Sequence, residues 1–199
     1  MTINTAKSLK VKEIEKEIKV CSKCPLHKTR KFPVPGEGNI DAKVMLIGLG
    51  PGYHENLKGK PFVGAAGKFL DELLQLAGLK REEVYITNVI KCYLSDNKPT
   101  EEEIEACTPY LDRQIKIIKP KIILTLGNVS TSYILKKFGF KTESMWKIHA
   151  KVFQISNLLL QTQIVPMYHP ASALYNPRMK VTLREDWRTL KNIENLNFN

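Results

Sequence analysis

The chain has 199 residues, of which 43% are hydrophobic, so its length suits one α/β domain with a real core and is too short for two full domains. Its 31 lysine and arginine residues against 20 aspartate and glutamate residues give a formal net charge of +11, which favours polyanionic partners, nucleic acid being the commonest. The sequence has no apolar run of the ~18 residues that a spanning helix needs, and residues 1–19 are rich in lysine, so we expect an intracellular, cytoplasmic and nucleoid-associated protein without membrane contact.

Helical and strand-like patterns alternate along the chain. Thr100 and Glu103 form a capping box at the start of one predicted helix, and Pro120 follows its end. The alternation argues for a largely parallel sheet that is covered on both faces. The pattern predicts helices at 3–20, 68–74, 101–118, 130–138 and 181–193, and strands at 44–47, 84–90, 122–127, 152–155 and 164–167.

The segment from Gly48 to Gly67 has the most unusual local sequence, G-L-G-P-G-Y-H-E-N followed by K-P-F-V-G-A-A-G. It lies between a predicted strand and a predicted helix, where open α/β sheets bind ligands. Because glycine has no side chain, backbone N–H groups here can approach a flat or anionic group closely. The segment matches neither GxGxxG nor GxxxxGK[ST], and a phosphate-cradling loop or a plain tight turn stays open as an alternative.

Four cysteines form the sharpest compositional signal. Cys21 and Cys24 have C-x2-C spacing, Cys92 follows a predicted strand, and fourteen residues separate it from Cys107. Disulfides are rare in a reducing cytosol, whereas four thiolates can bind zinc or a [4Fe–4S] cluster. A zinc ribbon usually has a second C-x2-C pair, so the wide second spacing fits a cluster at least as well. Without a metal, the set would be two buried cysteines and an exposed pair.

Together these residues resemble the family 4, iron–sulfur uracil-DNA glycosylases of the uracil-DNA glycosylase superfamily. The resemblance rests on the C-x2-C pair, G-x-G-P-G-x-x-E with G-K-P-F-V-G-x-x-G, the strand at 85–89 leading to Lys91 and Cys92, and His169-Pro170-Ala171. It implies a three-layer α/β/α sandwich with a central, mainly parallel four-stranded sheet, so one of the five predicted strands is surplus or an edge strand. It also implies a single domain over 1–199 and a [4Fe–4S] cluster without a redox role. The implied cluster ligands are Cys21, Cys24, Cys92 and Cys107.

The resemblance implies that the protein flips uracil out of DNA and hydrolyses its N-glycosidic bond, leaving free uracil and an abasic site, without lyase activity. The uracil leaves as an anion, so catalysis needs hydrogen-bond donors at its O2 more than a strong nucleophile. A neutral His169 is the candidate donor, supplemented by the backbone N–H groups of Leu49 and Gly50. A histidine in an isolated His-Pro pair would more often be satisfied within a core.

An everted base is stacked on an aromatic ring and read along its Watson–Crick edge. By resemblance, Phe62 is the stacking ring, and Glu55 crowds the C5 position and rejects the methyl group of thymine. Taken alone, Phe62 would be a core residue and Glu55 a solvated carboxylate. Asn88 can accept from uracil N3–H and donate to O4, whereas cytosine mismatches both groups. An asparagine at a strand end also often bonds local backbone.

One departure from the family pattern concerns the attacking water. The family commonly has glutamate in the second position of G-E-[AG]-P-G, where this chain has Leu49, and Gly50 lacks the acidic group that other glycosylase families place there. We therefore expect DNA phosphates to stabilise the sugar cation, with His54 or Glu55 orienting the water.

The segment after His169 holds the candidate DNA contacts. Leu174 and Tyr175 could fill the gap left by the everted base, and Arg178 could bind phosphate, although loop packing is the plainer explanation.

The expected partner is uracil-containing DNA, bound by a monomer. The alternative function is an iron–sulfur- or zinc-stabilised DNA-binding module or nuclease, but a nuclease would need clustered carboxylates for magnesium, which the motif loops lack. Further basic residues flank these loops: Lys58, Lys60, Lys180 and Arg184.

Overall fold

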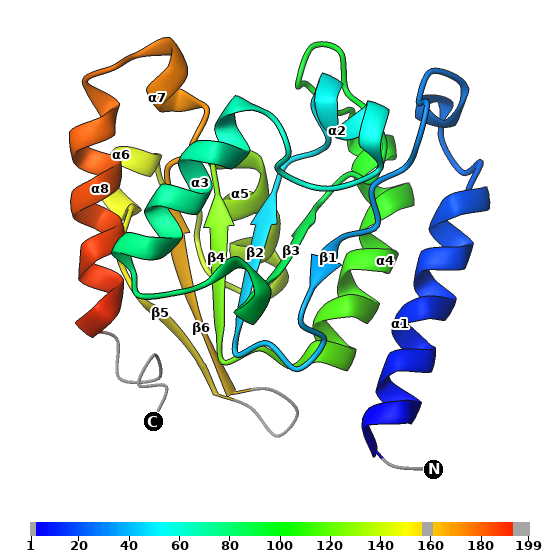
Figure 1. The fold of residues 1–199 in the computed structure, drawn as a ribbon, viewed down its shortest axis with the longest axis horizontal. Coiled ribbons are helices and arrows are strands. Elements are labelled where there is room, and N and C mark those ends of the chain that lie inside the picture. Colours follow the sequence, from blue (N-terminus) through cyan, green and yellow to red (C-terminus); the bar gives the residue numbers. More distant parts are fainter. Residues whose placement is uncertain (1–2, 157–160, 193–199) are drawn as a thin grey trace.

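A computed structural model describes residues 3–156 and 161–192 and shows a helix-covered sheet (Figure 1). Six strands form one sheet in the order β1-β3-β2-β4-β6-β5. The four inner strands run parallel and the two edge strands pair antiparallel. The strands are β1 (Glu37–Gly38), β2 (Val44–Gly48), β3 (Tyr85–Asn88), β4 (Ile122–Leu126), β5 (Phe153–Ser156) and β6 (Gln161–Met167).

The predicted four-stranded parallel core is therefore confirmed, but the complete sheet is wider than four strands. The surplus predicted strand at 152–155 is the antiparallel edge strand β5. The other edge, β1, was missed because a strand of two residues leaves no alternating pattern in the sequence.

The five predicted helices are all present, with ends that differ by a few residues. The predicted end of the last helix at residue 193 lies outside the described residues. Three helices of four to six residues were not predicted, since so few residues carry little periodicity. The helices are α1 (Ile3–Val20), α2 (Tyr53–Lys58), α3 (Ala65–Leu76), α4 (Glu101–Ile118), α5 (Asn128–Lys137), α6 (Met145–Ile148), α7 (Ser172–Tyr175) and α8 (Met179–Thr189).

The helices form two layers on either side of the sheet. In Figure 1, α3 and α8 lie in front of the strands and α5 lies behind them. Val44 and Leu46 of β2 pack with the residues of α3 and α8, whereas Met45 and Ile47 pack with α1, α4, α5 and α6. All of β2 is buried because both of its faces are covered. The architecture is the expected α/β/α sandwich.

The helix α4 begins and ends at the residues that the sequence predicted. The Thr100 side chain accepts from the Glu103 backbone N–H at 3.2 Å, and Glu103 Oε2 accepts from the Thr100 N–H at 2.9 Å. The capping box is thus confirmed, and the helix ends at Ile118, before Pro120.

The carboxyl ends of the parallel strands meet at one edge of the sheet, at the top of Figure 1 beneath α2 and α7. From β2 the chain first crosses to β3 on one side and later to β4 on the other. Such a switch in direction leaves room for a ligand above the strand ends. The loops that hold the candidate site residues follow β2, β3 and β6.

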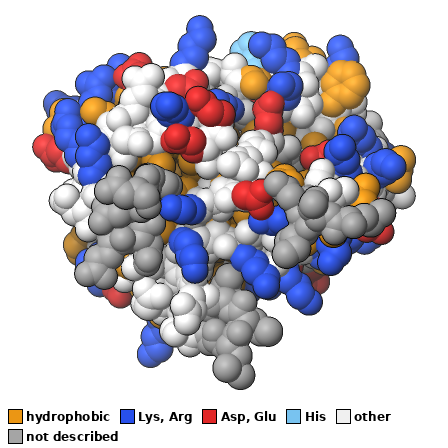
Figure 2. All heavy atoms as spheres, turned by 60° about the horizontal axis from the view of Figure 1, so that its bottom comes forward, with side chains coloured by type: hydrophobic (Ala, Val, Ile, Leu, Met, Phe, Trp, Pro, Cys, Tyr) orange, Lys and Arg blue, Asp and Glu red, His pale blue; other side chains and the backbone are white. Residues whose placement is uncertain are grey.

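Basic side chains are not confined to this edge. Figure 2 views the opposite end of the molecule and shows lysine and arginine side chains spread over that face, with acidic side chains among them. Basic side chains therefore also lie on a face away from the candidate site. Over the described ranges, no helix combines the length and the apolar character that crossing a bilayer requires.

Candidate active site

An open cavity of about 460 Å³ lies above the carboxyl ends of the parallel strands. Its lining brings together residues from the exits of β2, β3, β4 and β6. It includes most of the candidates for catalysis and base binding: Leu49, Gly50, Glu55, Phe62, Asn88 and His169. His54, the other candidate for orienting the water, is exposed and does not line the cavity.

Further lining residues were missed from the sequence. Gly127 joins β4 to α5, and Asn128 and Val129 open α5; a glycine directly after a buried strand is the signal that could have found them. Asn97 belongs to a loop without a recognisable pattern, so nothing in the sequence pointed to it.

Gly48 explains how the carboxamide of Asn88 and the ring of Phe62 can meet. The two residues Gly48 and Asn88 are paired in the β2–β3 register. A Cβ atom on Gly48 would lie 2.4 Å from Asn88 Oδ1 and 3.2 Å from the Phe62 ring. Only glycine leaves space for both side chains at this point.

Phe62 is held in an uncommon backbone conformation by its neighbours. Its φ is +51°, in the left-handed region that side chains rarely adopt. Arg81 Nη2 donates to the carbonyl oxygens of Pro61 at 2.7 Å and Phe62 at 3.2 Å. A Cβ atom on Gly67 would lie only 1.9 Å from the Phe62 carbonyl oxygen, so this glycine lets α3 pack directly against the loop.

Glu55 fastens the same loop from the other side. Its Oε1 accepts from the backbone N–H groups of Val63 at 2.8 Å and Gly64 at 3.0 Å. Gly64 is the N-cap of α3, where a carboxylate also interacts favourably with the helix dipole. Glu55 is therefore an anchor of the Phe62 loop as well as a cavity residue.

The contacts of His169 define its tautomer. The Ala171 backbone N–H donates to Nδ1 at 3.1 Å, so Nδ1 is an unprotonated acceptor. In a neutral imidazole the proton is then on Nε2. Burial lowers the pKa of His169 to about 4, although Glu55 opposes this shift. The ring also stacks on Phe62, with centroids 5.5 Å apart and planes inclined by 26°.

Asn88 is 2% exposed at the end of β3. Its backbone oxygen accepts from Lys91 Nζ at 2.7 Å. Within the described part of the chain, the carboxamide itself forms no hydrogen bond, so both of its polar ends are available to a ligand in the cavity.

The candidate DNA contacts lie beside the cavity. Leu174 and Tyr175, both on α7, are 46% and 86% exposed, and Tyr175 contributes to the cavity lining. Arg178 is exposed at the start of α8. Lys60 forms an exposed ion pair with Glu37 at 2.8 Å, a type of contact that water screens strongly.

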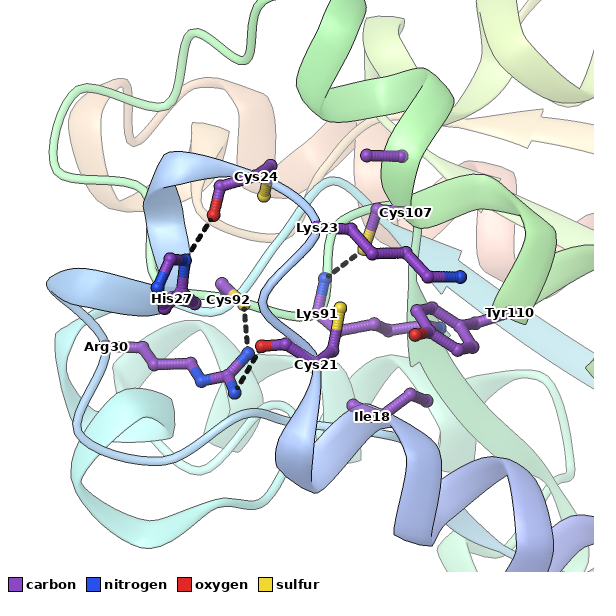
Figure 3. Close-up of a pocket in the computed structure, with 11 residues that line it drawn as sticks. Ile18, Cys21, Lys23, Cys24, His27, Arg30, Lys91, Cys92, Cys107 and Tyr110 are labelled. Atoms are coloured by element: carbon purple, nitrogen blue, oxygen red, sulfur yellow. Dashed lines mark hydrogen bonds between the residues drawn. The ribbon is translucent and has the colours of Figure 1, made fainter.

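All four cysteines line one narrow hollow between the end of α1, the exit of β3 and α4. Figure 3 shows their sulfur atoms turned toward this shared space. Cys92 and Cys107 are buried, Cys21 and Cys24 are partly exposed, and all four are free thiols.

Nitrogen donors face two of these sulfur atoms. Arg30 Nη1 donates to Cys92 Sγ at 3.0 Å, and Nη2 of the same guanidinium donates to the Cys21 carbonyl at 2.8 Å. The Lys91 backbone N–H donates to Cys107 Sγ at 3.2 Å. Burial raises the pKa of the Cys92 thiol, and Arg30 opposes this shift. Burial also raises the pKa of the Cys107 thiol to about 11, and Lys91 opposes that shift. Donors of this kind stabilise thiolates.

The donor set fits an anionic, sulfur-bound group. No group of three or more His, Cys, Asp or Glu side chains in residues 3–156 and 161–192 is arranged to hold a metal ion as it stands. A single zinc ion bonds each thiolate at ~2.3 Å and needs all four sulfur atoms close together. The four thiols that share this hollow are the residues that could hold zinc or a cluster of several iron atoms.

Comparison with known proteins identifies the relatives of the chain. Residues 35–191 match the family model described as the uracil DNA glycosylase superfamily. The chain is 49% identical over 180 residues to a type-4 uracil-DNA glycosylase of Saccharolobus solfataricus, covering 89% of this chain and 83% of that protein. It is 41% identical over 179 residues to the type-4 enzyme of Archaeoglobus fulgidus, covering 89% and 90%. It is 40% identical over 164 residues to that of Thermotoga maritima, covering 82% of each.

Proposed function

The chain belongs to the uracil DNA glycosylase superfamily, and from this premise we propose that it is a DNA repair hydrolase that removes uracil from DNA. It cleaves the N-glycosidic bond, releases free uracil and leaves an abasic site without cutting the strand. Relatives that carry the type-4 uracil-DNA glycosylase name align over most of both chains, which supports this activity over a non-catalytic DNA-binding module.

The neutral His169 is the observation that carries the mechanism. Because Nδ1 accepts from Ala171, the Nε2–H is the donor that can reach a group in the cavity. As the bond to the sugar breaks, negative charge develops on uracil O2, and a positioned N–H donor stabilises it. The backbone N–H groups of Leu49 and Gly50 supplement this donor.

Asn88 reads the everted base. Its Oδ1 accepts from uracil N3–H and its Nδ2 donates to O4, while the ring of Phe62 supplies a stacking surface. Cytosine presents an acceptor at N3 and a donor at C4, so both contacts fail. Glu55, which lines the cavity, crowds the C5 position in this proposal and disfavours thymine.

Water attack relies on electrostatics, since Leu49 and Gly50 provide no carboxylate. DNA phosphates stabilise the positive charge on the sugar. Glu55 is the better candidate to orient the water, because it lines the cavity and the exposed His54 does not.

Cys21, Cys24, Cys92 and Cys107 hold a [4Fe–4S] cluster in this proposal. The cluster supplies no redox step and ties together the end of α1, the exit of β3 and α4. Their common hollow and the N–H donors at two sulfur atoms support this assignment.

On the DNA side, Leu174 and Tyr175 enter the space left by the everted base, and Arg178 binds a phosphate. Their exposure on α7 and at the start of α8 supports this role. The protein acts on intracellular DNA as a monomer and as a single domain over residues 1–199.

Incubation with a single-stranded oligonucleotide that carries one uracil, followed by alkali, tests the function. We expect release of free uracil and strand scission only after alkali, with no scission when cytosine or thymine replaces the uracil. Scission before alkali would indicate a nuclease or lyase, and intact DNA after alkali would contradict glycosylase activity.

A further inference from the structure

Lys91 is a buried lysine located between the two functional regions. It is 1% exposed and lies three residues after Asn88 and directly before Cys92. Its side chain lines the cysteine hollow, as Figure 3 shows. None of the chemistry described above uses its ammonium group.

Three oxygen atoms accept from the ammonium. Lys91 Nζ donates to Thr87 Oγ1 at 2.6 Å, to the Asn88 carbonyl at 2.7 Å and to Gln114 Oε1 at 2.8 Å. These contacts use all three N–H bonds. Thr87 Oγ1 and Gln114 Nε2 in turn donate to the Pro35 carbonyl, each at 2.9 Å. The network joins β3, α4 and the loop before β1, and it includes the Asn88 carbonyl oxygen.

The charge of this ammonium needs a counterpart, because an unpaired buried charge is costly. No carboxylate among the described residues forms an ion pair with Lys91. Cys107 is the candidate counterpart, because its sulfur accepts from the Lys91 backbone N–H at 3.2 Å and a cysteine that binds a metal does so as a thiolate. A centre built on four thiolates is anionic and can balance this cation.

We propose that Lys91 is a positioning residue: its ammonium holds the Asn88 end of β3 and thereby sets the preference for uracil over cytosine. The thiolate centre balances the charge of this ammonium. The inference rests on the proposed function. A change at Lys91 acts on base recognition through Asn88, since Lys91 does not line the cavity that receives the base.

The test measures base preference without turnover. The probes are two single-stranded oligonucleotides, one with 2′-fluoro-deoxyuridine and one with 2′-fluoro-deoxycytidine, since the fluorine disfavours the oxocarbenium-like sugar and prevents cleavage. The readouts are the ratio of the two affinities and the iron and sulfide content per chain. A loss of folded protein alone lowers the bound fraction but does not change the affinity ratio of the folded molecules.

Three variants separate positioning from folding. Lys91→Met removes the ammonium and keeps the side-chain length. Thr87→Val removes one acceptor and keeps the shape, while Gln114 still satisfies the Pro35 carbonyl. Lys116→Met, an exposed lysine on the same helix as Gln114, is the matched control.

We expect Lys91→Met to lower the uracil-to-cytosine affinity ratio about tenfold, which equals about 1.4 kcal/mol, and to lower the iron content. Thr87→Val should lower the ratio about threefold with iron retained, and Lys116→Met should change neither. A ratio within about twofold of the wild-type value in Lys91→Met would overturn the proposal. If that variant does not fold, an unchanged ratio in Thr87→Val would overturn it equally. Failure of the wild-type protein to prefer the uracil probe or to release uracil would instead contradict the proposed function.

Discussion

The neutral state of His169 predicts how uracil release depends on pH. The pKa is lowered from 6.5 to about 4, so the ring is protonated only in acid. At pH 6, a histidine with a pKa of about 4 is about 1% protonated, whereas one with the ordinary value would be about three-quarters protonated. Protonation at Nδ1 would also abolish the bond from the Ala171 N–H.

Single-turnover release of uracil from an oligonucleotide, measured between pH 4 and pH 8, tests this pH dependence. We expect no titration by His169 near pH 6.5 and a rate that falls about tenfold per pH unit only below the lowered pKa. Replacing His169 with alanine removes one donor to the developing oxyanion and should slow release by ~10²- to 10³-fold, or about 2.7–4 kcal/mol. His54→Ala, which changes an exposed histidine outside the cavity lining, should leave the rate unchanged.

The same shift predicts a stability change with a definite sign. Between pH 6.5 and about 4 the unfolded chain binds the proton and the folded chain does not, so stability is lost as the pH falls through this window. The loss is about 2 kcal/mol at pH 5 relative to pH 8. Urea unfolding should show this loss in the wild type and not in His169→Ala.

Two kinetic results would contradict a neutral, donating His169. One is a transition in the rate of uracil release near pH 6.5 that disappears in His169→Ala, and the other is a rate for that variant within about fivefold of wild type.

Two further predictions concern residues that hold the loops. Arg30→Met removes the donor to Cys92 Sγ and the tie to the Cys21 carbonyl, so iron per chain and absorbance near ~400 nm should fall, while Lys28→Met in the neighbouring turn should retain both. Equal iron content in the two variants would contradict this role. Glu55→Ala leaves two backbone N–H groups without their acceptor and should lower the free energy of urea unfolding by about 2–3 kcal/mol, whereas Glu55→Gln should lose about half as much. Equal stability of both variants and the wild type would show that the anchor is unimportant.

The main elements of the fold and the candidate site residues could be predicted from the amino-acid pattern alone. The helix at Ile3–Val20 and the inner strands could be predicted because apolar periodicity records which side of an element faces a core. The motif residues Phe62, Asn88 and His169 could be selected because they occur in order with glycines and cysteines of specific spacing. The two-residue strand β1 and the short helices could not, because so few residues carry no period.

The contacts that hold these residues in place come from the packing of distant elements and could not be predicted. Three contacts depend on packing. Glu55 accepts from the Phe62 loop, His169 Nδ1 accepts from Ala171, and Lys91 joins β3 to α4. Gln114 and Pro35 are 79 positions apart, and no local pattern in the sequence encodes such a contact. Periodicity specifies which face of an element is buried, but the partner of each polar group is set by how the elements pack against one another.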